Sequence, residues 1–280
     1  MRILETPRDA IQGLPDFIPT KKKIELLNEL LKVDFDIVDV GSFVSDKAIP
    51  QFRDMKEVLE SIDIADSKSE IFILVANRKG GEIAAGFEQV DIIGFPFSTS
   101  PEFLKRNINS DFIKAEKTID ELQNIALKSK KKIFIYLSMA FGNPYGDSDS
   151  PKLIYHWAEK LISKGITAIG LSDITGVAKP DMIAEIYSVL TKDFTETEFG
   201  IHLHVKDDDW YDKIDAASKN GCSIFDGVIN GLGGCPMTGY DLLGNLPTGN
   251  LLEYARKNNI SLAINPEQFE KAYMKFIEIV

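Results

Sequence analysis

The sequence predicts an α/β fold, a (β/α)₈ TIM barrel with closing C-terminal helices, for three reasons. Short apolar runs rich in β-branched residues alternate with longer amphipathic stretches along the whole chain. The apolar runs are nearly continuous, which is typical of parallel strands buried on both faces. A length of 280 residues fits the roughly 250 residues of such a barrel, so we expect one catalytic domain over 1–280.

Eight strands and at least five helices are expected in alternation. Thr20 is expected to cap its helix, and Gly165 and Gly221 to end theirs. A doubly wound open sheet would show the same alternation, so counting strands leaves that fold open. The predicted strands are 3–4, 35–40, 71–75, 90–94, 133–137, 168–171, 199–203 and 224–228. The predicted helices are 20–32, 111–128, 151–164, 180–190 and 210–220, and 251–280 should form the closing helices.

Composition excludes several classes of protein. A net charge of −11 argues against nucleic acid as a partner, because phosphate binding requires a basic surface. We find neither an apolar run of the roughly 18 to 20 residues that span a membrane nor a signal-peptide pattern. The two cysteines, Cys222 and Cys235, make no disulfide framework, so we expect a cytoplasmic protein.

Polar side chains follow most of the predicted strands. In a barrel the carboxyl ends of all strands meet on one face, where such enzymes place their active sites. The pattern therefore predicts an active site on that face. The residues concerned are Arg8, Asp9, Asp39, Asn77, Arg78, Ser98, Ser138, Asp173, His202, His204 and Asn230.

His202 and His204 are separated by one residue at the end of a predicted strand. Alternate strand residues face the same side, so both imidazoles can bind one ion. Adding Asp9 gives two nitrogen ligands and one carboxylate, which suits Mg²⁺, Mn²⁺ or Zn²⁺. Two polar residues bonded to their neighbours would give the same spacing. Cys235 lies in a glycine-rich segment, 231–236, where a thiol can act as an acid or base, whereas Cys222 is expected to be buried and inert.

Taken in order, these residues resemble the hydroxymethylglutaryl-CoA lyases, a family of barrel metallolyases, over nearly the whole chain. The segments that carry the resemblance are Pro7-Arg8-Asp9 with Gln12, Ser42-Phe43-Val44-Ser45 with Lys47 and Pro50-Gln51, Asn107-Ile108-Asn109, Gly142 to Gly146, Leu171-Ser172-Asp173 with Gly176, His202-Leu203-His204, Gly231 to Pro236, and Gly244 to Thr248.

The resemblance implies a lyase that cleaves 3-hydroxy-3-methylglutaryl-CoA, or a related 3-hydroxyacyl-CoA, to acetyl-CoA and acetoacetate with a divalent cation. Arg8 would stabilise an enolate, Cys235 would assist proton transfer, and Asp173 would act as an acid, a base or an orienting group beside the substrate. Asp39 completes the predicted catalytic set. The implied metal ligands are Asp9, His202, His204 and Asn245, and the predicted substrate contacts are Gln12, Ser138, Asn77 and Asn109.

Four positions depart from the family pattern. Asp39 replaces a glutamate, so we expect its contact with Arg8 or the metal shell to pass through water. Val205 replaces an aspartate, Asn143 replaces a cysteine, and the segment from Cys235 to Asn245 is one residue longer. These departures leave the exact hydroxyacyl substrate open.

Two other functions stay open. One is a Claisen-type synthase or 4-hydroxy-2-oxo acid aldolase of the same superfamily, and the other is a binding barrel without catalysis. The family often forms homodimers, although no sequence feature marks an interface. Arg78, Lys79, Lys105 and Arg106 could supply charge for CoA phosphates and equally fit a solvated surface.

Overall fold

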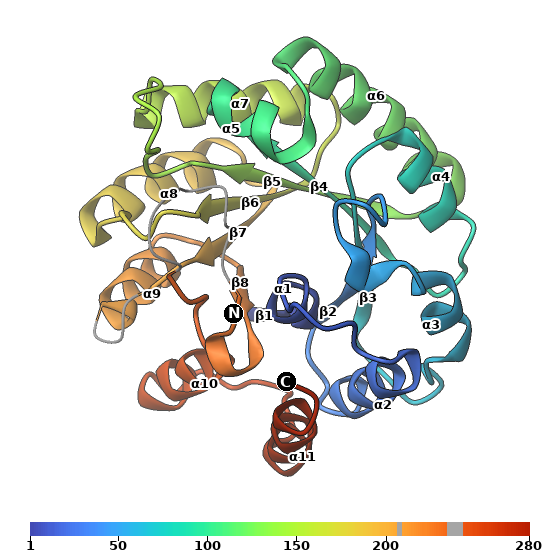
Figure 1. Ribbon diagram of the computed structural model, residues 1–280. Coiled ribbons are helices and arrows are strands. Elements are labelled where there is room, and N and C mark those ends of the chain that lie inside the picture. The colour runs from blue at the N-terminus through green and yellow to red at the C-terminus, as the bar shows by residue number, and fades with distance from the viewer. Residues whose placement is uncertain (206–208, 234–242) are drawn as a thin grey trace.

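The computed structural model describes residues 1–205, 209–233 and 243–280. Eight parallel strands form a closed barrel in chain order, and β8 pairs with β1 to complete it (Figure 1). The barrel is confirmed, and the open-sheet alternative is excluded because no edge remains between β1 and β8. The strands are β1 (Arg2–Glu5), β2 (Ile37–Phe43), β3 (Glu70–Val75), β4 (Ile92–Ser98), β5 (Lys132–Ser138), β6 (Ala168–Asp173), β7 (Glu198–Leu203) and β8 (Ile224–Gly227).

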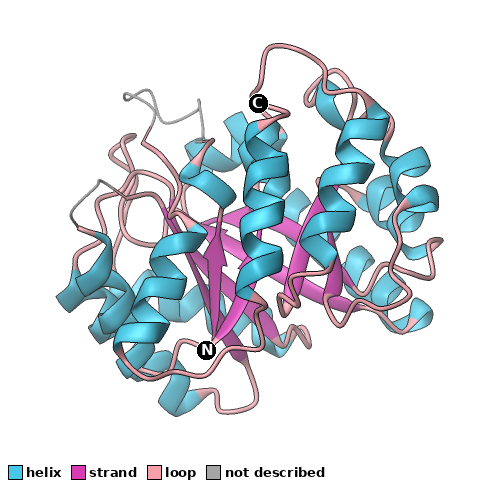
Figure 2. Ribbon diagram, turned by 90° about the horizontal axis from the view of Figure 1, so that it is seen from below, coloured by secondary structure: helices cyan, strands magenta, loops and turns pink. Residues whose placement is uncertain are grey.

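Helices surround the strands, while α1 lies over the barrel mouth beside β1 and β2 (Figure 1). The closing helices are confirmed as α10 and α11, and α11 packs against α2. Figure 2 shows the strands enclosed by helices when the molecule is turned by 90°. The helices are α1 (Pro7–Ile11), α2 (Thr20–Leu31), α3 (Met55–Ser61), α4 (Arg78–Ala85), α5 (Pro101–Ile108), α6 (Phe112–Ser129), α7 (Pro151–Ser163), α8 (Pro180–Asp193), α9 (Trp210–Lys219), α10 (Thr248–Lys257) and α11 (Pro266–Ile277), with short 3₁₀ turns η1 (Pro50–Phe52) and η2 (Ile229–Gly231). No helix within the described residues is long and apolar enough to cross a membrane.

Local sequence signals explain where the helices begin and end. Gly165 and Gly221 follow α7 and α9 with φ of 85° and 89°, as expected for glycine after a helix. The expectation for Thr20 was wrong, because Pro19 occupies the capping position and Thr20 is already helical. Side-chain caps are made instead by Asn77, Ser100, Asp111, Ser150 and Asn265.

Large and small residues alternate inside the barrel. The rings of Phe72 and Phe134 fill its interior opposite glycines on neighbouring strands. A Cβ atom on Gly94 would lie 2.0 Å from Cζ of Phe72, and one on Gly170 would lie 2.7 Å from Cε1 of Phe134. The barrel centre is therefore a packed core.

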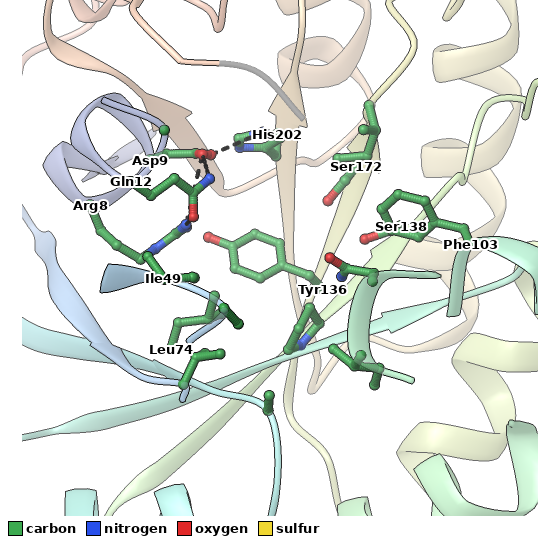
Figure 3. A pocket seen from close by; sticks show the side chains of 18 of the residues that line it. Arg8, Asp9, Gln12, Ile49, Leu74, Phe103, Tyr136, Ser138, Ser172 and His202 are labelled. Carbon is green, nitrogen blue, oxygen red and sulfur yellow. Dashed lines mark hydrogen bonds and ion pairs between the residues drawn. The ribbon is translucent and has the colours of Figure 1, made fainter. Parts of the chain in front are cut away.

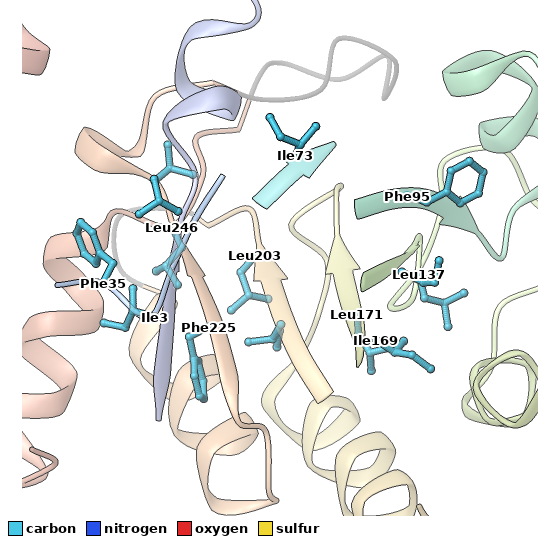
Figure 4. Close-up of a cluster of buried hydrophobic side chains, with 14 of the residues drawn as sticks. Ile3, Phe35, Ile73, Phe95, Leu137, Ile169, Leu171, Leu203, Phe225 and Leu246 are labelled. Atoms are coloured by element: carbon cyan, nitrogen blue, oxygen red, sulfur yellow. The ribbon is translucent and has the colours of Figure 1, made fainter. Parts of the chain in front are cut away.

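A second and larger core lies between the barrel and its helices. Figure 4 shows outward-facing strand side chains of this core, among them Ile3, Phe95 and Leu203 (Figure 4). The amino-terminal end of the barrel carries a charged network instead, in which Arg2 donates to Glu198 at 2.7 Å and to Glu70 at 2.8 Å. The apolar core therefore separates this charged network from the polar residues at the carboxyl ends of the strands.

Candidate active site

A cavity of about 380 Å³ opens at the carboxyl ends of the strands, above this core (Figure 3). Its lining is mainly polar on the side of β1, β5, β6 and β7 and, apart from Asn107, apolar on the side of β2, β3 and β4. The polar lining residues are Arg8, Asp9, Gln12, Asn107, Tyr136, Ser138, Ser172, His202 and His204, and the apolar ones include Val44, Ala48, Ile49, Leu74, Pro96, Phe103 and Ile108.

Arg8 is held by two side chains in a buried ion pair. Its Nε donates to Asp39 at 2.6 Å, and its Nη1 donates to Gln12 at 3.0 Å. The expectation of a water-bridged contact for Asp39 was therefore wrong, because α1 lies directly on β2 and brings the guanidinium to the shorter side chain. Arg8 is consequently fixed in one orientation at the cavity wall.

Burial and charge act on this pair in opposite directions. Burial lowers the pKa of Arg8, but the nearby carboxylates of Asp39 and Asp9 raise it overall, so the guanidinium stays charged. Burial raises the pKa of Asp39 to about 7, against the opposing effect of Arg8. Burial also acts to raise the pKa of Asp9, but Arg8 and the two histidines lower it overall.

His202 lies between two carboxylates. Its Nδ1 is 3.2 Å from Oδ2 of Asp226, and its Nε2 is 3.7 Å from Oδ2 of Asp9. Asp226 also accepts a hydrogen bond of 2.8 Å from the Tyr136 hydroxyl. A carboxylate behind one imidazole nitrogen orients the ring and leaves the other nitrogen free to bind an ion. Burial lowers the pKa of His202, but the hydrogen bond to Asp226 raises it overall.

His204 and Asn245 are brought together by backbone pairing between the end of β7 and residues 244–247. A bridge pairs them, and Leu246 N–H donates to Leu203 at 2.9 Å, so residues 244–247 extend across the ends of β7 and β8. Burial, and then His202, lowers the pKa of His204 to about 4. The Nδ2 of Asn245 donates to the Leu232 carbonyl at 2.9 Å.

The residues present fit a divalent cation by two observations. The Oδ1 of Asn245 is buried and has no hydrogen-bond partner in the described structure, and a buried oxygen without a partner is costly unless an ion or water binds it. Two buried carboxylates, those of Asp9 and Asp39, pair with the Arg8 guanidinium, and a third, that of Asp226, lies beside His202, so the carboxylates of the site outnumber its guanidinium group. Within the described part of the chain, no three His, Cys, Asp or Glu side chains are already closed into a metal-binding group.

The remaining predicted site residues divide into four groups, of which Asn77 and Asn109 form the last. Gln12 and Ser138 line the cavity. Asp173 is buried beside it, and its carboxylate accepts from the amides of Val177 at 3.0 Å and Ala178 at 2.9 Å, so it shapes the loop after β6. Burial raises the pKa of Asp173 overall. Cys235 lies outside the described residues.

Asn77 and Asn109 are not brought to the cavity. Asn77 is exposed and caps α4 by accepting from Gly80 at 3.0 Å. Asn109 is exposed and ends α5 in the left-handed conformation, with φ of 50°. Asparagine is common at both kinds of helix end, so the local sequence does not distinguish a capping asparagine from one that binds substrate. Asn107, two residues earlier in the chain, lines the cavity.

Three buried polar residues were missed by sequence reasoning. Tyr136 and Asp226 lie inside apolar strands, β5 and β8, and Glu5 ends β1. Glu5 accepts from Ile229 N–H at 2.7 Å and from the Thr248 hydroxyl at 2.5 Å, and so ties β1 to the segment after β8. The available signal was a carboxylate within an otherwise apolar strand, because such a group requires partners when it is buried.

The fold and the site together define a class of protein, a (β/α)₈ barrel with an enzyme-like polar cavity at the carboxyl ends of its strands. A family model described as HMGL-like matches residues 2–275, so the chain belongs to the HMGL-like family.

Two kinds of relative agree with this assignment. The mitochondrial hydroxymethylglutaryl-CoA lyase of Bos taurus is 31% identical over 97% of this chain and 83% of that protein, and the lyase YngG of Bacillus subtilis is 28% identical over 97% and 90%. The HMG-CoA lyase of Acinetobacter baumannii, solved with coenzyme A and 3-methylmalate, superposes with a TM-score of 0.91 at 27% identity, covering 99% of this chain and 90% of that one. The carboxyl transferase domain of Rhizobium etli pyruvate carboxylase is 12% identical with a TM-score of 0.70 and covers 99% of this chain and 47% of that one, which is a likeness of fold alone.

Proposed function

We propose that the protein is a divalent-metal-dependent lyase that cleaves 3-hydroxy-3-methylglutaryl-CoA to acetyl-CoA and acetoacetate. The observation that carries this proposal is the meeting of Arg8, Asp9 and His202 at one cavity, in a chain whose relatives are named for that activity. The coenzyme A in the Acinetobacter baumannii structure supports an acyl-CoA substrate.

The cation would be held by Asp9, His202, His204 and Asn245. Nitrogen and oxygen donors of this kind suit Mg²⁺ or Mn²⁺, and Zn²⁺ is the third candidate. The free Oδ1 of Asn245 and the excess of buried carboxylates support this ligand set. When bound, the cation would polarise the hydroxyl and an adjacent oxygen of the substrate.

Arg8 would stabilise the charge that forms during cleavage. The substrate hydroxyl gives its proton to solvent, the C2–C3 bond breaks, and its electron pair moves to the thioester fragment as an enolate. A guanidinium held at 2.6 Å by Asp39 and at 3.0 Å by Gln12 does not need to reorient when this charge appears. Such prearranged donors are the usual source of electrostatic catalysis.

The enolate must then gain a proton on carbon. We assign this step to Cys235, as the family resemblance implies, because a thiol can deliver a proton directly to carbon. Asp173 would orient the loop after β6 through its two amide contacts, since it does not line the cavity. Gln12 and Ser138 would contact the substrate from the polar wall.

An assay of the purified protein tests this proposal. With Mg²⁺ or Mn²⁺ present, we expect release of acetoacetate from 3-hydroxy-3-methylglutaryl-CoA and loss of that activity after chelation. Related 3-hydroxyacyl-CoA esters should be assayed beside it, because the substitution at Asp39 leaves the acyl group open. Metal binding without cleavage of any thioester would refute the lyase and favour an aldolase or synthase.

The cellular setting is part of the same proposal. We expect the protein to act in the cytoplasm, without nucleic acid or membrane as a partner, and to form a homodimer like other members of its family. Sedimentation analysis of the purified chain tests the dimer.

A further inference from the structure

Gln51 is a buried side chain with three hydrogen bonds that the proposed chemistry does not use. It lies in η1 and is 3% exposed. Its Oε1 accepts from Ile18 N–H at 3.1 Å, and its Nε2 donates to the carbonyls of Leu14 at 3.1 Å and Asp16 at 2.6 Å. These residues belong to 12–19, which has no helix or strand of its own. The side-chain amide therefore supplies hydrogen-bond partners to three backbone groups of a segment that makes no helix or strand hydrogen bonds of its own.

The same segment is anchored on its other side. The main-chain carbonyl of Gln51 accepts from the buried Lys23 ammonium group, which also pairs with Asp54 at 2.5 Å. The ring of Phe17 lies 4.2 Å from Nζ of Lys23 and 3.9 Å from Cζ of Arg53. Residues 14–18 are thus held between α2 and η1.

Each of the two segments that Gln51 joins carries part of the cavity wall. Gln12 and Gly13 immediately precede residues 14–18, and Ala48 and Ile49 immediately precede η1. Gln12 and Ile49 are both seen at the cavity in Figure 3. We propose that Gln51 is a positioning residue that sets the spacing of these two wall segments and hence the binding of the acyl-CoA. This inference rests on the proposed function for the identity of the ligand.

Gln51→Glu is the sharpest perturbation, because it keeps the shape and the Ile18 acceptor. An ionised glutamate loses both donors and places an oxygen against two carbonyl oxygens, whereas a protonated glutamate regains one donor. We expect KM for the thioester to rise roughly tenfold at pH 8.5 and by much less at pH 6, while kcat changes less than about threefold.

Gln89→Glu is the matched control. Gln89 also uses its Nε2 to donate to a backbone carbonyl, that of Leu59 at 2.7 Å, but it does not line the cavity. This variant should keep the KM and kcat of the native protein at both pH values. If Gln51→Glu does not fold, Gln51→Met removes both donors without adding charge and should raise KM in the same way at every pH.

Hydrogen exchange without substrate separates this inference from the proposed function. Gln51→Glu should increase amide exchange in residues 12–18 at pH 8.5, and Gln89→Glu should leave that segment unchanged. Native-like KM and exchange in the folded Gln51 variants, or a fall in kcat at constant KM, would overturn the positioning role. Absence of thioester cleavage by the native protein would instead overturn the proposed function, and the exchange of residues 12–18 would still decide whether Gln51 holds the segment.

Discussion

Replacing Glu5 by glutamine should remove a pH-dependent loss of stability. Glu5 is fully buried, and burial raises its pKa from 4.5 to about 8, against the hydrogen bonds from Thr248 and Ile229. Between these two values the folded state retains a proton that the unfolded chain has lost. The contribution of Glu5 is therefore complete below pH 4.5 and is lost as pH rises toward 8.

The size of the effect follows from the shift. At about 1.4 kcal/mol per pKa unit, the change from 4.5 to about 8 corresponds to about 5 kcal/mol of unfolding free energy. Glutamine is neutral at every pH, and it can still accept from Ile229 N–H and donate to the Thr248 oxygen. Glu5→Gln should therefore resemble the native protein near pH 5 and be several kcal/mol more stable at pH 9.

Urea denaturation at intervals from pH 5 to pH 9 measures this difference. Glu60→Gln is the control, because Glu60 is exposed on α3 and the substitution removes the same charge at the surface. The control should follow the native protein across the range. If the unfolding free energies of the native protein and Glu5→Gln differ by a constant amount from pH 5 to pH 9, burial of the Glu5 carboxyl does not destabilise the fold as pH rises.

Three further predictions concern the site and the barrel core. His204→Ala should weaken metal binding by at least about 100-fold, which is more than the loss of a residue that only hydrogen-bonds a metal ligand would cause. Full metal occupancy of this variant by elemental analysis would contradict the ligand assignment. Cys235→Ser should lower kcat by roughly 10²-fold or more with metal still bound, and an unchanged rate would remove the thiol from the mechanism. Gly94→Ala should destabilise the fold by about 1–3 kcal/mol, because its Cβ would lie 2.0 Å from the Phe72 ring. Gly249→Ala, with no atom within 4 Å of the new Cβ, is the control in the same thermal-unfolding experiment and should be neutral or slightly stabilising.

Much of the barrel was predictable because its signals are local. The apolar runs and amphipathic periods depend on neighbouring residues, so eight strands and the main helices could be placed from them. Boundaries were less accurate at both ends of the strands: β2 begins at Ile37, not at 35, and β4 runs to Ser98, past the predicted end at 94. β4 continues to pair with β5 as far as Ser98, because the length of a strand depends on where its neighbour can still form hydrogen bonds with it.

The amino-acid sequence by itself determined the alternation of strands and helices and the row of polar residues at the strand ends, including His202 and His204 on one face of the chain at the end of β7, because strand periodicity is a local property. Only the tertiary structure decided which of these residues meet. Asp226 and Tyr136 are 90 positions apart and bond across the barrel, Asp39 reaches Arg8 directly, and Asn77 and Asn109 stay at helix ends outside the cavity. The physical reason is that closure of the barrel sets distances between strands that no spacing along the chain records.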